Sequence, residues 1–265
     1  MSVILYEKVD NIAVITLNRP EKLNALNSAV IHGLHEYMHK AGDDPEVKVI
    51  VLRGAGKKAF TAGFDLTEAM GNNITDVVAR RADTRSEMDF FMYMWYLPKP
   101  IICAVQGYCI GGGTQFTQVA DLIIAADNAT FGNPEALLGY TPEWSIDLYK
   151  LPLNKLTEWA FLAKYFSAEE LREIGFVNEV VPFEQLEERT MEVARLVARI
   201  PSESMAIMKY TIRECYDIRG LSNTLDFCVE TFNLNRIRMQ QNEAAALKEE
   251  IAEGGLSAAL KRRYN

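Results

Sequence analysis

Two short apolar runs flank a triple glycine in the middle of this chain. The runs are 100–105 and 122–126, and the glycines occupy 111–113. Apolar runs separated by a helix-compatible stretch indicate buried strands joined by a helix. Glycines at a strand-to-helix junction let backbone N–H groups approach a ligand closely. One carboxylate, Glu135, follows the second run. The segment therefore predicts a site that stabilises a developing oxyanion beside a general acid or base.

Apolar runs and helical patterns alternate through the first half of the chain, which predicts an α/β architecture. Strands are expected at 11–17, 47–52, 101–106 and 122–126, and helices at about 28–41, 74–96 and after the glycines. Beyond Pro152 the pattern becomes mostly helical, with one last edge strand at 177–182. The later helices are expected at 156–164, 168–173, 183–199, 203–217 and, as one long segment, 224–253. We expect an α/β core over residues 1–200 and a helical region over 201–265.

The net charge and the composition limit the classes of molecule that this chain is expected to bind. The formal net charge is −8, which argues against nucleic acid or an anionic membrane as the main partner. No apolar run approaches the length of a membrane span, and the first residues lack the pattern of a signal peptide. The four cysteines have no metal-ligand spacing, which is typical of reduced thiols. A cytoplasmic protein is expected.

Several blocks of the sequence together resemble the signatures of the enoyl-CoA hydratase/isomerase (crotonase) family. They include Leu-Asn-Arg-Pro with Asn-Ala-Leu-Asn, then Ala-Phe-Thr-Ala-Gly-Phe-Asp-Leu, and then a central block that ends in Phe-Gly-Asn-Pro-Glu. A later Gly-Phe-Val-Asn-Glu-Val-Val-Pro and the Lys-Arg-Arg tail match as well. The blocks lie, in the family's order, at 17–27, 59–66, 99–135, 175–182 and 261–263. Each motif is weak alone, but in register they cover essentially the whole chain.

The resemblance implies a spiral of ββα turns followed by C-terminal helices that mediate trimerisation. Members of the family commonly form trimers or dimers of trimers, so a homotrimer or a dimer of trimers is expected. The implied substrate is an acyl-CoA thioester. No metal and no redox cofactor is implied, because coenzyme A enters as part of the substrate.

The resemblance also assigns roles to backbone and side-chain groups of the site. The thioester carbonyl is expected between the backbone N–H groups of Phe64 and Gly112. Two such amides aimed at an enolate oxygen typically contribute several kcal/mol. Glu135 is expected to exchange a proton with a carbon near the carbonyl, and burial would raise its pKa toward neutrality.

One position departs from the family pattern and leaves the reaction open. Typical hydratases carry a second Glu where this chain has Gln115, and a Gln cannot take a proton. Members with a single carboxylate here include double-bond isomerases and hydratase-lyases. Glu143, eight residues beyond Glu135, is a candidate for restoring a second acid, and a solvated loop residue is an equal alternative. Double-bond isomerisation is therefore slightly favoured over hydration.

Coenzyme A is expected to contact two segments of the chain. The matching positions are Lys22, Leu23, Asn24, Ala62, Asp65 and Leu66. The Lys-Arg-Arg tail at 261–263 is a further candidate for phosphate contact, in its own or a neighbouring subunit. An aromatic and Met-rich stretch, 86–96, flanks the acyl pocket in the resembled fold. Phe90, Met94 or Trp95 would set chain length there, but ordinary core or a subunit interface is the favoured interpretation.

Two alternatives outside this class remain. One is an acyl-CoA-binding protein that has lost activity. The other is a zinc peptidase, because His35-Glu36-Tyr37-Met38-His39 fits the H-E-x-x-H pattern, with His32 one turn earlier. We interpret that match as a coincidence on a polar helix face, since it falls inside the helix after the first crotonase signature.

Overall fold

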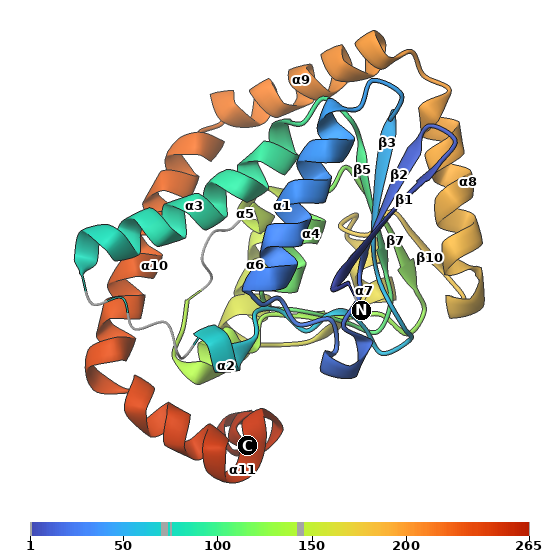
Figure 1. Ribbon diagram of the computed structural model, residues 1–265. Helices are drawn as coiled ribbons and strands as arrows, with labels where there is room; N and C mark the ends of the chain where they lie inside the picture. Colours follow the sequence, from blue (N-terminus) through green and yellow to red (C-terminus); the bar gives the residue numbers. More distant parts are fainter. Residues whose placement is uncertain (1, 70–73, 75, 142–145, 265) are drawn as a thin grey trace.

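A computed structural model describes residues 2–69, 74, 76–141 and 146–264 (Figure 1). In these residues the larger sheet has six strands, paired in parallel except for β1, which is antiparallel to β2. In spatial order they are β1 (Ile4–Val9), β2 (Ile12–Leu17), β3 (Val49–Gly54), β5 (Ile101–Val105), β7 (Leu122–Ala126) and β10 (Glu179–Val181). Parallel strands buried on both faces read as continuous apolar runs, which is why the sequence indicates them.

A smaller sheet of four strands completes the core. In spatial order its strands are β4 (Ala59–Thr61), β6 (Tyr108–Ile110), β8 (Thr130–Gly132) and β9 (Phe166–Ser167). Each strand has only two or three residues, too few for a periodic pattern, and none of them was predicted. Strand β1 was also missed, and the strand expected at 47–52 lies two residues later.

The chain visits the two sheets in turn, and a helix follows each visit. The first turn is β3, β4, α2 (Leu66–Ala69) and α3 (Val77–Tyr96), and the second is β5, β6 and α4 (Gly112–Val119). The third is β7 and β8, followed by η2 (Pro134–Leu138), α5 (Asp147–Lys150) and α6 (Leu153–Leu162). This succession confirms the predicted spiral of ββα turns.

Helices cover both faces of the larger sheet (Figure 1). Helix α8 (Leu186–Ala198) packs on one face, while α1 (Ser28–Asp43), α3 and α4 lie on the other. Asn27 begins α1 as predicted, because its side chain accepts a hydrogen bond from the Val30 amide at 3.0 Å. The remaining short elements are η1 (Pro20–Lys22), α7 (Ala168–Glu173) and η3 (Phe183–Gln185).

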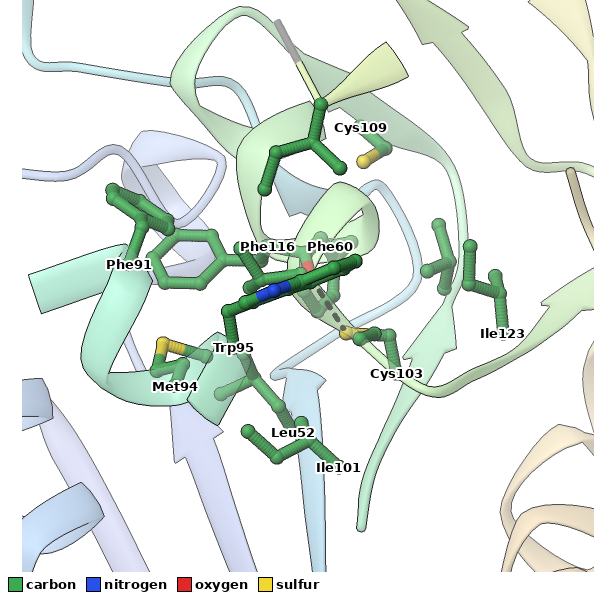
Figure 2. Close-up of a cluster of buried hydrophobic side chains, with 14 of the residues drawn as sticks. Leu52, Phe60, Phe91, Met94, Trp95, Ile101, Cys103, Cys109, Phe116 and Ile123 are labelled. Atoms are coloured by element: carbon green, nitrogen blue, oxygen red, sulfur yellow. Dashed lines mark hydrogen bonds between the residues drawn. The ribbon is translucent and has the colours of Figure 1, made fainter. Parts of the chain in front are cut away.

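The aromatic half of α3 belongs to the core beneath α4. Phe91 and Trp95 gather with Phe116 of α4 and Cys103 of β5 (Figure 2). Phe90, Met94 and Trp95 are all buried, which confirms the interpretation of this stretch as core. The packing fixes α4, and so fixes the direction in which its first residues point.

The C-terminal helices are α9 (Ser202–Ile218), α10 (Leu221–Asn242) and α11 (Ala244–Tyr264). The single helix predicted over 224–253 is wrong, because the chain leaves helical geometry at Glu243, where φ is −130°. Neither Pro nor Gly marks that break. After it, α11 turns back against η2, where Leu247 joins Met239 and Leu138 in a small apolar cluster (Figure 1). The predicted boundary at residue 200 falls between α8 and α9, and the division into two regions stays a prediction.

Candidate active site

A cleft of about 1870 Å³ opens beside the start of α4. Its walls come from α1, α3, α4, the loop at 62–66, η2 and the C-terminal helices α10 and α11. Small-molecule pockets usually measure about 300–1,000 Å³. This cleft is therefore large enough for an extended ligand.

Glu135 of η2 places its carboxyl group against the backbone of Gly111. A Cβ added at Gly111 would lie 2.1 Å from Oε1 of Glu135, and φ of Gly111 is +57°, so glycine is required there. Burial raises the pKa of Glu135 to about 7, and its own backbone N–H offsets part of that effect. Oε2 is buried and has no hydrogen-bond partner among the described residues. The carboxyl group is thus poised to gain and lose a proton near neutral pH.

Gly112 is the first residue of α4. The first amides of a helix have no acceptor within the helix, and the helix dipole adds positive potential there. The ring of Phe64 lies over this residue, because a Cβ added at Gly112 would be 2.6 Å from the ring. The Gly112 amide is therefore next to the loop that carries Phe64.

Hydrogen bonds between Leu26 and the residues on either side of Phe64 set the direction of the Phe64 amide. The Leu26 amide donates to the carbonyl of Gly63, and the Asp65 amide donates to the carbonyl of Leu26, both at 2.9 Å. This parallel bridge uses the carbonyl of Gly63, which shares a peptide group with the Phe64 N–H, and the N–H of Asp65. The Phe64 N–H consequently points away from Leu26. The structure thus brings together Phe64, Gly112 and Glu135.

An ion pair holds the Phe64 loop in place. Arg19 Nη1 lies 3.3 Å from Asp65 Oδ2 and also donates to the carbonyl of Ala25 at 2.7 Å. Asp65 therefore contributes to the loop's position as well as to the wall of the cleft. Of the positions expected to contact coenzyme A, four line the cleft, namely Leu23, Ala62, Asp65 and Leu66.

Lys22 and Asn24 are not among the described residues that line the cleft. Lys22 is exposed on η1. Asn24 is buried, and its side chain donates to the carbonyls of Ala55 and Ala59 at 2.9 and 2.8 Å. The Asn24 side chain therefore holds backbone segments together rather than facing a ligand.

Gln115 follows Gly112 by three residues in α4, is buried and lines the cleft. It shares this cleft with Glu135. Glu143 lies outside the described residues, so its relation to the site stays a prediction.

The histidines of α1 stack against rings of α3. His35 lies 3.8 Å from Phe90 and His39 lies 4.0 Å from Tyr93, measured between ring centroids. Across 2–69, 74, 76–141 and 146–264, no three His, Cys, Asp or Glu side chains come together in a group that would hold a metal ion. The aromatic contacts give this face of α1 a packing role.

The sequence did not indicate that α3 and α10 bring charged groups to the cleft. Arg80, Asp83 and Glu87 of α3 line it, together with Arg236 of α10. Their spacing on α3 places them on one helix face, but only the fold shows that this face borders the cleft. The basic tail also reaches this region of its own chain, because Arg263 Nη1 donates to the carbonyl of Leu137 at 3.1 Å.

No helix in the described part of the chain has the length and apolar character needed to cross a membrane.

Comparisons with known proteins agree with this fold. The sequence profile of the family described as enoyl-CoA hydratase/isomerase matches residues 7–244. A short-chain-enoyl-CoA hydratase of Clostridium acetobutylicum is 32% identical over 231 residues, which is 84% of each chain. A crotonyl-CoA hydratase of Syntrophomonas wolfei is 33% identical over 210 residues, or 78% of each. The crystal structure of an enoyl-CoA hydratase/isomerase from Xanthobacter autotrophicus Py2 superposes with a TM-score of 0.92 at 31% identity, covering 99% of this chain and 97% of that one. The chain has the crotonase fold and belongs to the enoyl-CoA hydratase/isomerase family.

Proposed function

We propose that this protein transfers a proton on an acyl-CoA thioester through an enolate held between the amides of Phe64 and Gly112. The observation that carries the proposal is the carboxyl group of Glu135. Its Oε2 is buried without a partner in the described residues, its pKa is raised to about 7, and it lies beside the glycines that begin α4. Such a group is suited to general acid–base chemistry at neutral pH.

The mechanism follows from these positions. The thioester carbonyl oxygen accepts hydrogen bonds from the two amides, which stabilise negative charge as it develops. In isomerisation of a 3-enoyl thioester, the Glu135 carboxylate takes a proton from C2 and the electron pair moves onto the carbonyl oxygen as a dienolate. The same proton then returns to C4, which leaves a 2-enoyl thioester. The amides take the place of a metal ion in stabilising the charge, so the proposed reaction needs no metal or redox cofactor.

Isomerisation is slightly favoured because Gln115 is an amide. It orients a water or substrate oxygen by hydrogen bonds and takes no proton. Hydration is the second candidate, since the two relatives compared above carry hydratase names. In that reaction Glu135 would work with Gln115, or with Glu143 as a second acid. A hydratase-lyase reaction uses the same enolate.

The wall of the cleft supports a coenzyme A site. Leu23, Ala62 and Leu66 provide backbone and apolar contacts for the pantetheine and adenine, and Lys22 or the basic tail provides charge for the phosphates. Lys261 lines the cleft, which supports the second of these. Coenzyme A enters only as part of the substrate.

We also propose that the protein is a homotrimer or a dimer of trimers. Large apolar side chains are exposed on α6, α9 and α10, among them Phe161, Ile207, Ile218 and Phe227. Exposed apolar surface of this kind marks contact sites between chains. Light scattering after size exclusion tests the assembly, and a monomer mass of 29.9 kDa would contradict it.

The reaction is tested with a panel of 2-enoyl-, 3-enoyl- and aromatic acyl-CoA thioesters, with product identification by chromatography. Glu135→Gln should abolish turnover, whereas the matched control Glu184→Gln, an exposed residue of η3, should retain it. Conversion of 3-enoyl to 2-enoyl thioester supports isomerisation, and formation of a 3-hydroxy thioester supports hydration. Thioester binding without any turnover would instead support the inactive binding protein.

A further inference from the structure

Helix α3 carries a polar stripe on a face that is buried. Arg80, Asp83, Thr84 and Glu87 are spaced at i, i+3, i+4 and i+7, which places them on one side of the helix. Arg80 is only 4% exposed and Thr84 is fully buried, where α3 packs against α10. Burying polar groups costs free energy unless they are paired, so a polar helix interface beside a cleft calls for a physical reason.

The stripe is joined to α10 by a hydrogen-bonded network. Thr84 donates to Asn233 Oδ1 at 2.8 Å and accepts from Arg236 Nη1 at 3.4 Å. Asp83 Oδ2 lies 3.2 Å from Arg80 Nη1 and 3.8 Å from Arg236 Nη1. One carboxylate therefore lies between two guanidinium groups. Glu87 adds a second attraction to Arg80 from the same face of α3.

Asn233 Nδ2 and Arg236 both have hydrogen-bonding capacity left over among the described residues, and of the two only Arg236 lines the cleft. Both of its polar contacts use Nη1, and no described residue accepts from Nη2 or Nε. The side chain lines the cleft and is 16% exposed. Phe232, one turn earlier, lies 5.2 Å from the guanidinium carbon, which helps to fix its orientation. The cleft thus contains a positioned guanidinium edge that is open toward a ligand.

Tyr140 lies on a loop that is tied to α10, because the carbonyl of the preceding Gly139 accepts hydrogen bonds from Asn235 and Arg238. Burial raises the pKa of Tyr140, while Arg236 and Arg80 act to lower it. Its hydroxyl has no partner among the described residues, and the ring lines the cleft. The Tyr140 amide donates to the carbonyl of Glu135 at 2.9 Å, so the loop that carries this hydroxyl starts at the proposed catalytic carboxylate.

We propose that the acyl group of the substrate ends in a carboxylate, which is bound by Arg236 and the hydroxyl of Tyr140. The substrate class is a coenzyme A thioester of a dicarboxylic acid. This rests on the proposed function only in that a thioester occupies the cleft. A guanidinium fork matches a carboxylate in charge and geometry. A methyl-terminated acyl chain would instead remove water from Arg236 without offering it a partner.

The test measures dissociation constants for pairs of saturated thioesters that differ only at the chain end. The pairs are succinyl- and butanoyl-CoA, adipyl- and hexanoyl-CoA, and suberyl- and octanoyl-CoA. The wild-type protein should bind the carboxylated member of at least one pair about tenfold or more tightly. Arg236→Gln should remove that preference, and Tyr140→Phe should reduce it. Arg81→Gln is the matched control, because Arg81 is an exposed Arg of α3 that pairs with Glu230 of α10 and is not part of the described cleft wall.

Three results would overturn the proposal. They are a wild-type protein without the preference, an Arg236→Gln protein that keeps it, and an Arg236→Gln protein that binds acetyl-CoA and every other thioester more weakly by the same factor. The last result would show that Arg236 contacts the phosphates of coenzyme A. Should Arg236→Gln not fold, Arg236→Lys and Tyr140→Phe are judged by the same criteria.

The outcome is independent of turnover, because the saturated probes bind without reacting. A preference for the carboxylated member in a protein that converts no enoyl thioester would support this inference and contradict the proposed reaction. Turnover of neutral enoyl thioesters by a protein that binds both members of every pair equally well would support the proposed reaction and contradict this inference.

Discussion

Adding one methyl group at Gly112 tests whether the two amides form the oxyanion site. A Cβ at this position would lie 2.6 and 2.7 Å from two carbons of the Phe64 ring. Carbon atoms pack comfortably at about 3.5–4.0 Å, so the ring must withdraw by about 1 Å. Gly112 is not among the glycines with positive φ, so Gly112→Ala adds no backbone strain of that kind. The clash therefore acts on Phe64, whose amide is one of the two proposed donors.

We expect Gly112→Ala to lower kcat strongly and the free energy of unfolding only modestly. Misplacing a reacting group by about 1 Å can cost about 100-fold, and losing one oxyanion donor costs about 100- to 1,000-fold in kcat. Overpacking of this size destabilises by about 1–3 kcal/mol. We therefore expect Gly112→Ala to fold and to lose about 100-fold in kcat with the best thioester of the panel.

The assay is kcat at saturating thioester, with thermal unfolding as the check on folding. The matched control is Gly254→Ala in α11, where an added Cβ comes no closer than 3.2 Å to its nearest neighbour. A folded Gly112→Ala protein whose kcat stays within about threefold of wild type would refute the reasoning, because the donors would then not depend on the packing of Phe64 over Gly112.

Three further predictions follow from buried charges. First, Glu135 must be ionised to take a proton, and its pKa is about 7. We therefore expect kcat/KM to rise about tenfold per pH unit below pH 7 and to level off above it, whereas a profile that is flat from pH 5 to 8 would contradict this. Second, the pKa of Glu135 is raised from 4.5 to about 7 by folding, so ionisation of this group lowers the free energy of unfolding as the pH rises from 4.5 to 7. Urea unfolding should therefore show that Glu135→Gln stabilises the protein by up to about 3 kcal/mol at pH 8 but not at pH 4. Third, Asp121 pairs at 2.6 Å with both Lys209 and Arg213, whose side chains are 4% and 7% exposed. Urea unfolding should show that Asp121→Asn lowers the free energy of unfolding by about 3–5 kcal/mol, and a decrease below about 1 kcal/mol would show that these charges are solvated.

The larger sheet was predictable because its strands are long and buried on both faces. The run at 122–126 forms β7 over the expected residues, and Asn27 caps α1 as its side-chain chemistry indicates. The smaller sheet was not predictable, since its pairings join two- and three-residue segments that lie far apart in the chain. The break at Glu243 was also hidden, because packing of α11 on η2 rather than a local signal places it there.

The candidate site was only partly accessible from the sequence. Residue types and glycine placement suggested an oxyanion site beside Glu135, but nothing in the spacing shows that Phe64 lies over Gly112. The expectation that the amides of Phe64 and Gly112 share the thioester carbonyl came from the resemblance to a family and stays a prediction, while the structure shows the Leu26 bridge and the ring contact. Arg236 was missed because the sequence of α10 does not reveal which of its faces borders the cleft.

We propose that Glu135 moves the proton of a thioester that two backbone amides polarise. The most direct measurement is the rate at which the protein exchanges a carbon-bound proton of its acyl-CoA substrate with deuterium from D₂O, followed by mass spectrometry. We expect exchange by the wild-type protein and a loss of about 100- to 10,000-fold in Glu135→Gln. Exchange by a folded Glu135→Gln protein at the wild-type rate would contradict it.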